Sequence, residues 1–269
     1  VRELTSAKVV YYGHDLHFRR IGLEAKVLGA SGDAAEVERQ ERAIWREVDV
    51  VLYPSQDEAR DVKALEPDVD ARAVPPYAFG NVVRSSRSVD RDGLLFVAGF
   101  AHTPNVDAAK WLVGEVMPLV WARVPDLKLA LVGSNPSPEV RALASERVEV
   151  TGYVDDAELA RRYAGARVAV VPLRYGAGIK NKVVEALQQG VPLVTTSVGA
   201  QGLPGLPEVC DVADDVQSHA ALVLGLLDDD ELWLKRAREG AEYVSGMFSP
   251  AAMSDALLRA MGLVDGDQA

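Results

Sequence analysis

The sequence predicts an α/β fold in which helices cover parallel sheets. Three observations support this class: short runs of apolar residues typical of strands buried on both faces, amphipathic stretches between those runs, and glycine or proline where the two alternate. The 269 residues suffice for one large or two ordinary domains. Apolar residues make up 48% and charged residues 26% of the chain, which argues against disorder and fibrous repeats.

The first segment, residues 1–78, alternates strands and helices without completing a domain. Its patterns predict strands at 7–12, 49–53 and 71–74, and helices at 19–28, 34–48 and 55–65. Ser55-Gln56-Asp57-Glu58 forms a capping box that marks the start of the third helix. The Glu- and Arg-rich stretch 36–47 predicts a solvated helix face. Because three strands are too few for a doubly wound domain, we interpret this segment as the second half of one.

Residues 79–92 predict a linker, because they combine glycine, asparagine, serine and arginine with no apolar run after Val83. Beyond the linker the alternation becomes regular. Strands are expected at 94–98, 127–132, 148–151, 167–172, 191–195 and 208–213, and helices at 105–123, 138–145, 155–164, 180–189, 216–227, 230–245 and 250–263. Residues 93–248 therefore predict a complete Rossmann-like domain, with one more helix in 249–269.

Charge and composition exclude several classes of protein. The chain has 29 Lys and Arg against 40 Asp and Glu, a net charge of −11, which argues against binding to nucleic acid or to an anionic membrane surface. No apolar run approaches the roughly 20 residues of a membrane span. The single cysteine, Cys210, excludes an internal disulfide and favours a reducing, cytoplasmic location. The chain opens Val1-Arg2-Glu3-Leu4, so we interpret it as a fragment or a processed chain.

The loop at 173–182 is the strongest candidate site, because ligands of open α/β sheets bind beyond the carboxyl ends of strands. Two glycines are followed there by a helix that opens with Lys180 and Lys182. Cations are unfavourable at a helix N-terminus, so this pattern favours a bound anion that offsets them. Glu185 follows one turn later on the same face, where a carboxylate would accept hydrogen bonds from ribose hydroxyls. The alternative is a solvated Lys182–Glu185 pair behind an ordinary turn.

Other familiar sites do not fit the sequence. The P-loop pattern is absent, and Gly176–Asn181 has asparagine where a dinucleotide fingerprint needs its third glycine, which argues against a dehydrogenase. His14 and His17 have no third ligand nearby, which argues against zinc. We expect His219 on a helix surface and Cys210 as a buried, small apolar residue.

The 171–203 block resembles the donor-binding signature of the group 1 glycosyltransferases, nucleotide-sugar enzymes of the GT-B fold in glycosyltransferase family 4. The matching runs are Val171-Pro172-Leu173-Arg174, Gly176-Ala177-Gly178-Ile179-Lys180, Lys182-Val183-Val184-Glu185-Ala186, Gly190–Thr196 and Gly199-Ala200-Gln201-Gly202-Leu203. Weaker likenesses occur in Thr151-Gly152-Tyr153-Val154, in Gly99-Phe100 with His102 and Pro104–Ala108, and in Gly13-His14-Asp15-Leu16-His17.

The resemblance implies a GT-B-like fold with a complete donor domain and a truncated N-terminal acceptor domain, onto which the final helix crosses back. It also implies a set of roles. Glu185 would bind ribose, Lys180 with the helix N-terminus around Gly178 would hold the diphosphate beside Lys182, Gly99 would allow close approach of phosphates, Tyr153 and Val154 would border the base, and His14 would approach the reacting sugar. The chain departs from the family pattern at Ala177, where a second glutamate is common. It also has His102 and Asn105 where arginine and lysine commonly hold the diphosphate, and the resemblance implies that these two residues belong to the donor site.

The function that this resemblance implies is transfer of a sugar from a nucleoside diphosphate sugar to an acceptor hydroxyl. We expect retention of anomeric configuration, no metal and no cofactor, and a glycan, lipid-linked or small-molecule acceptor. Two alternatives stay open: a catalytically incomplete nucleotide-sugar-binding module, and a doubly wound domain that binds no nucleotide. The sequence names neither the base, the sugar, the acceptor nor the oligomeric state.

Overall fold

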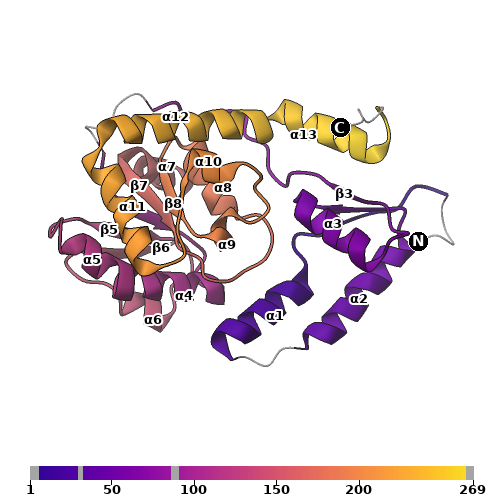
Figure 1. Ribbon diagram of the computed structural model, residues 1–269, viewed down its shortest axis with the longest axis horizontal. Coiled ribbons are helices and arrows are strands. Elements are labelled where there is room, and N and C mark those ends of the chain that lie inside the picture. The colour runs from indigo at the N-terminus through magenta and orange to yellow at the C-terminus, as the bar shows by residue number, and fades with distance from the viewer. Residues whose placement is uncertain (1–5, 30–32, 86–90, 265–269) are drawn as a thin grey trace.

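The computed structural model describes residues 6–29, 33–85 and 91–264, and it contains two parallel sheets with helices packed on them (Figure 1). The smaller sheet has the strand order β1-β2-β3, and the larger has the order β6-β5-β4-β7-β8-β9. Within the described residues, every pair of neighbouring strands is parallel. The predicted α/β class with parallel sheets is therefore confirmed.

The smaller sheet is built from the first segment of the chain. Its elements are β1 (Val10–Tyr12), α1 (His17–Leu28), α2 (Ala34–Glu47), β2 (Val50–Tyr53), α3 (Gln56–Leu65) and β3 (Ala71–Ala73). The strands hold their side chains in a core around Trp45, whose indole Nε1 donates to the Tyr53 hydroxyl at 3.2 Å. The predicted helices and strands of this segment are present, although β1 is shorter than expected.

The larger sheet carries the regular alternation. Its strands are β4 (Asp92–Val97), β5 (Leu129–Val132), β6 (Val148–Gly152), β7 (Ala166–Val171), β8 (Leu193–Thr195) and β9 (Asp211–Val212). Its helices are α4 (Thr103–Trp111), α5 (Met117–Trp121), α6 (Pro138–Arg141), α7 (Asp156–Gly165), α8 (Asn181–Gln188), α9 (Ser197–Ala200), α10 (Leu206–Val209), α11 (Val216–Asp228) and α12 (Asp230–Met247). The helix α13 (Pro250–Met261) follows.

Two predicted elements differ from the structure because of proline. The helix expected at 105–123 is interrupted by a π-helical turn at Leu112–Val116, where Met117 N–H bonds to the Leu112 carbonyl. Pro118 has no N–H for the preceding turn and its ring crowds the carbonyl of Gly114, so a wider turn relieves both problems. The strand expected at 208–213 is wrong in its first half, which is α10, with Pro207 in its first turn.

One prediction of solvent exposure is wrong, for His219, and another, for the stretch 36–47, holds except at individual residues such as Glu41. His219 is 0% exposed, because α11 packs between β7 and α5; its Nδ1 lies 3.1 Å from the Ala213 carbonyl and its ring meets Trp111 edge-on. Glu41, within the stretch expected to be a solvated face, is 5% exposed. Cys210 is buried as predicted.

The part of the chain that the structure describes connects the two sheets at several places. Residues 79–85 run past α8, where Gln188 Nε2 donates to the Asn81 carbonyl at 2.6 Å; residues 86–90 of the predicted linker lie outside the described residues. The helix α13 lies over the smaller sheet (Figure 1), and Arg72 Nη1 donates to the carbonyls of Arg259 and Ala260 at 2.8 and 2.9 Å. Within the described ranges, no helix is both long enough and apolar enough to cross a membrane.

A further connection joins the loops that follow β1 and β7, at the carboxyl ends of both sheets. A Cβ at Gly178 would lie 3.0 Å from Asp15 Cβ and 3.1 Å from the His14 carbonyl oxygen. Gly178 also has φ +70°, which glycine adopts at little cost. Only a residue without a side chain therefore lets these two loops approach so closely.

Candidate functional site

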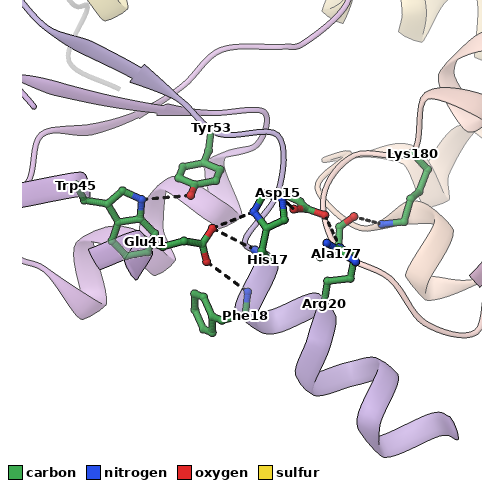
Figure 2. Close-up of polar contacts among 9 residues, drawn as sticks. All are labelled: Asp15, His17, Phe18, Arg20, Glu41, Trp45, Tyr53, Ala177 and Lys180. Carbon is green, nitrogen blue, oxygen red and sulfur yellow. Dashed lines mark hydrogen bonds and ion pairs between the residues drawn. The ribbon is translucent and has the colours of Figure 1, made fainter. Parts of the chain in front are cut away.

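The loop between β7 and α8 is held by its own lysine. Lys180, the N-cap residue of α8, donates from Nζ to the carbonyls of Ala177 at 2.9 Å and Gly178 at 2.5 Å (Figure 2). Burial lowers the pKa of Lys180 to about 8, although the carboxylates of Glu58 and Asp15 favour its charged form. Lys180 therefore supports the loop from inside and places a positive charge beneath it.

A second lysine ties α8 to the loop that follows β4. Lys182 Nζ donates to Asn105 Oδ1 at 2.5 Å, and Asn105 Nδ2 donates to the Gly99 carbonyl at 2.7 Å. Burial, followed by the neighbouring charge of Lys180, lowers the pKa of Lys182 to about 8. The structure thus brings three predicted site residues, Gly99, Asn105 and Lys182, into one hydrogen-bonded chain. An anion at this position would favour the charged form of the ammonium group.

A cavity of about 310 Å³ lies at the carboxyl ends of β4, β5 and β6, next to the start of α8. Five predicted residues line it: Gly99, Tyr153, Val154, Lys182 and Glu185. Tyr153 is 78% exposed, which leaves its ring available to a ligand, whereas Glu185 is partly buried and burial raises its pKa. The cavity therefore combines an exposed aromatic ring, a carboxyl group and an ammonium group.

Gly133 and Ser134 also line this cavity, and the sequence interpretation missed them. Gly133 has φ +144°, and a Cβ there would lie 1.9 Å from the Ala98 carbonyl oxygen. Glycine is therefore required where the ends of β4 and β5 converge. A glycine directly after the buried run Leu129–Val132 was the available signal.

A larger cavity, of about 580 Å³, lies at the opposite edge of the same sheet. It is lined by the first residues of β4, β5 and β6, including Asp92, Leu129 and Val148. Because ligands of parallel sheets bind at the carboxyl ends, where helix N-termini offer unpaired N–H groups, we place the functional site in the smaller cavity.

The loop after β1 lies against the loop that precedes α8, at Gly178. His14 is exposed, and its carbonyl oxygen is the atom that crowds Gly178. The next residues are fixed by polar contacts (Figure 2): His17 lies 3.1 Å from Glu41 and 3.3 Å from Asp15, and Asp15 accepts from Arg20 at 3.2 Å. The loop that carries His14 is therefore held in one conformation.

Glu41 explains how α1 begins. The N-cap residue of α1 is Leu16, whose apolar side chain makes no hydrogen bond to the first turn. Glu41, from α2, instead accepts from the backbone N–H groups of His17 and Phe18 at 3.2 and 3.3 Å. A carboxylate at a helix N-terminus is favoured by the helix dipole, which accounts for a charged residue buried in a stretch expected to face solvent.

The remaining predicted residue, His102, is the exposed N-cap residue of α4. It lines neither the 310 Å³ cavity nor the 410 Å³ cavity described below, within the part of the chain that the structure covers. In residues 6–29, 33–85 and 91–264, no three His, Cys, Asp or Glu side chains group closely enough to hold a metal ion.

Two parallel sheets that meet at their carboxyl ends, with a helix N-terminus and a cavity at the junction, define the GT-B architecture. The chain belongs to the family described as "Glycosyl transferases group 1", whose model matches residues 91–229. The predicted family is therefore confirmed. A crystal structure of a TarM mutant from S. aureus, in complex with fondaparinux, α-GlcNAc-glycerol and UDP, has a TM-score of 0.77, and this likeness, at 13% identity over 95% of this chain and 51% of that one, confirms the predicted fold.

Two curated proteins are similar in sequence to part of the chain. The first, an uncharacterised 44.6 kDa protein in the cps region of Klebsiella pneumoniae, is 28% identical over 162 residues, 57% of this chain and 40% of that protein. The second, a phosphatidyl-myo-inositol mannosyltransferase of Mycolicibacterium smegmatis, is 30% identical over 137 residues, 46% of this chain and 34% of that protein. The matches thus span less than half the length of either relative.

Proposed function

We propose that this chain carries the donor site of a glycosyltransferase that moves a sugar from a nucleoside diphosphate sugar to an acceptor hydroxyl. The observation that carries the proposal is the 310 Å³ cavity, which places Tyr153, Glu185 and Lys182 at the carboxyl ends of the strands. Membership of the group 1 family supports the same function. UDP in the TarM complex supports a nucleotide as the donor's leaving group.

In this proposal each part of the donor has a partner. The base would stack beside Tyr153 and Val154, and the ribose hydroxyls would donate to Glu185. The diphosphate would lie at the N-terminus of α8, near Lys182 and above Lys180. Because the leaving diphosphate gains negative charge in the transition state, the two ammonium groups and the helix N-terminus would stabilise it, and we propose that the reaction uses no metal or cofactor.

The acceptor would enter from the side of the smaller sheet, where His14 faces the loop at Gly178. We propose that the acceptor hydroxyl attacks with retention of anomeric configuration. The bond from the anomeric carbon to the diphosphate oxygen breaks, the bond to the acceptor oxygen forms on the same face of the ring, and the proton of the acceptor hydroxyl passes to the leaving diphosphate. A glycan, a lipid-linked sugar or a small molecule would fit this description.

One observation favours a second candidate function. Among the described residues, the smaller sheet has three strands, against six in the larger sheet. With so small a second sheet, the chain would still bind the donor at the larger sheet but would have little of an acceptor pocket. The chain would then be a nucleotide-sugar-binding module without transferase activity of its own.

The test is release of nucleoside diphosphate from α-linked donors, namely UDP-glucose, UDP-GlcNAc and GDP-mannose, with water as the acceptor and EDTA present. We expect release from one donor, with the α anomer of the free sugar formed first in an NMR time course. The β anomer would contradict retention, and release that requires an added metal would contradict the metal-independent reaction. Binding without release would favour the module.

A further inference from the structure

Glu58 is a buried carboxyl group with one oxygen that no described protein group satisfies. It is the third residue of α3, and its backbone N–H bonds to Ser55 Oγ at 3.2 Å, as in a capping box. The carboxylate reaches back to Ser55, whose Oγ donates to Oε2 at 2.9 Å and whose backbone also interacts with it. The other oxygen, Oε1, is buried without a hydrogen-bond partner among the described residues, and Glu58 is 6% exposed.

The unsatisfied oxygen lies against the loop that precedes α8. A Cβ at Gly178 would be 3.6 Å from Glu58 Oε1. Here a cavity of about 410 Å³ separates the two sheets, with Leu16, Ser55 and Glu58 on one wall and Ala177, Gly178 and Gly202 among the residues of the other. The volume falls in the range of roughly 300–1,000 Å³ that is usual for small-molecule sites.

The second wall offers little side-chain chemistry near Glu58. Ala177 contributes a methyl group, and Gly178 and Gly202 contribute none. A Cβ at Gly202 would lie 3.0 Å from Ser55 Cβ, so this glycine too is needed where the walls approach. Polar recognition from this wall is limited to backbone groups and the side-chain amide of Gln201, and the remaining polar groups come from the wall that carries Glu58.

The carboxylate of Glu58 is available to a ligand, because the arginines that line this cavity pair with other carboxylates. The two other carboxylates that line the described cavity form ion pairs, Asp61 with Arg19 and Asp57 with Arg60. Burial raises the pKa of Glu58 to about 7. The charge of Asp15 also raises this pKa, whereas the hydrogen bond from Ser55 and the charge of Lys180 lower it. A buried carboxyl oxygen without a donor is unfavourable, and a ligand hydroxyl would supply that donor.

We propose that Glu58 binds a hydroxyl of the donor's sugar ring and thereby helps to set which sugar the chain accepts. This inference rests on the proposed function, which places the diphosphate at the N-terminus of α8. A sugar attached to that diphosphate would enter the 410 Å³ cavity, which Gly178 lines on one wall and Glu58 on the other. Sites that hydrogen-bond a substrate hydroxyl discriminate strongly against analogues that lack it, because the protein group is then left unpaired.

The test compares two ligands in three variants. Isothermal titration calorimetry measures the Kd of a nucleoside diphosphate and of its nucleotide sugar, chosen from UDP with UDP-glucose or UDP-GlcNAc and GDP with GDP-mannose. We expect Glu58→Leu to weaken binding of the nucleotide sugar about tenfold and Glu58→Gln to weaken it less. A tenfold change in Kd corresponds to about 1.4 kcal/mol, which is close to the contribution of one hydrogen bond to a charged group. The nucleoside diphosphate should keep its affinity within twofold in both variants. Asp57→Asn, on the same cavity wall but exposed, is the matched control and should change neither Kd.

The outcomes separate the inference from the function on which it rests. If the wild-type chain binds neither ligand, the proposed function fails and the inference fails with it. If it binds both ligands but the Glu58 variants change the two Kd values equally or not at all, only the inference is overturned. The thermal midpoint at pH 8 shows whether each variant folds, and Glu58→Gln, which keeps the shape of the side chain, carries the test if Glu58→Leu does not fold.

Discussion

Replacing Glu185 with alanine is expected to weaken nucleoside diphosphate binding about 10- to 100-fold. Glu185 lines the 310 Å³ cavity one turn into α8, where its carboxylate would accept from the ribose hydroxyls. Hydrogen bonds to a charged group contribute about 1.5–3 kcal/mol, and each 1.4 kcal/mol corresponds to tenfold in Kd. Isothermal titration calorimetry of both proteins with the same nucleotide measures the change.

The control for this prediction is Asp156→Asn, which removes an exposed carboxylate from the same cavity. We expect that variant to bind within threefold of wild type. The thermal midpoint of Glu185→Ala should stay close to that of wild type at pH 8, because burial raises the pKa of Glu185 and its ionised form therefore costs folding free energy. Equal affinity of wild type and Glu185→Ala would contradict a ribose-binding role.

Replacing Lys182 with methionine is expected to weaken nucleoside diphosphate binding by a similar factor, about 10- to 100-fold, and to change its pH dependence. Burial lowers the pKa of the Lys182 ammonium to about 8, and a bound diphosphate would favour the charged form. The wild-type affinity should therefore fall as pH rises above about 8, and binding there should take up protons. Titrations at pH 7, 8 and 9, in two buffers of different ionisation enthalpy, measure both effects.

In Lys182→Met the fall in affinity between pH 7 and 9 should be shallower, since Lys180 is left as the remaining lysine with a lowered pKa at the loop. Lys110→Met removes an exposed lysine of α4 that pairs with Glu139, and it should leave both the affinity and its pH dependence unchanged. A Lys182 variant that binds like wild type at every pH would show that the diphosphate lies elsewhere.

The larger part of the fold could be predicted from local sequence patterns. The strands were predictable because parallel strands buried on both faces are nearly continuous apolar runs, as in β7, and the donor-site loops were predictable because they follow such strands. Gly99, Tyr153, Val154, Lys182 and Glu185 lie in three separate parts of the chain, yet they line one cavity. Their meeting follows from the rule that parallel strands present their carboxyl ends at one edge.

The misses have tertiary causes. His219 lies on α11, and the sequence of that helix does not show that other elements pack over this residue. Glu41 is buried because the first turn of α1 packs against it and donates its backbone N–H groups to the carboxylate. The role of Glu58 was hidden for the same reason: the capping box predicts the start of α3 but not that the loop at Gly178 packs against its carboxylate. Contacts between the two sheets are set by packing at long sequence separation, which local periodicity does not encode.

The measurement that tests the central claim most directly is a thermal-shift titration of this chain with UDP, GDP, ADP and dTDP in the absence of metal. A free ligand at 100 times its Kd adds about 2.7 kcal/mol to the free energy of unfolding, which gives a clear rise in the unfolding midpoint. We predict such a rise with one of the four nucleotides and a clearly smaller rise at the same concentration in Glu185→Ala. A folded chain whose midpoint is unchanged at millimolar concentrations of all four would contradict a nucleotide-sugar donor site in the 310 Å³ cavity.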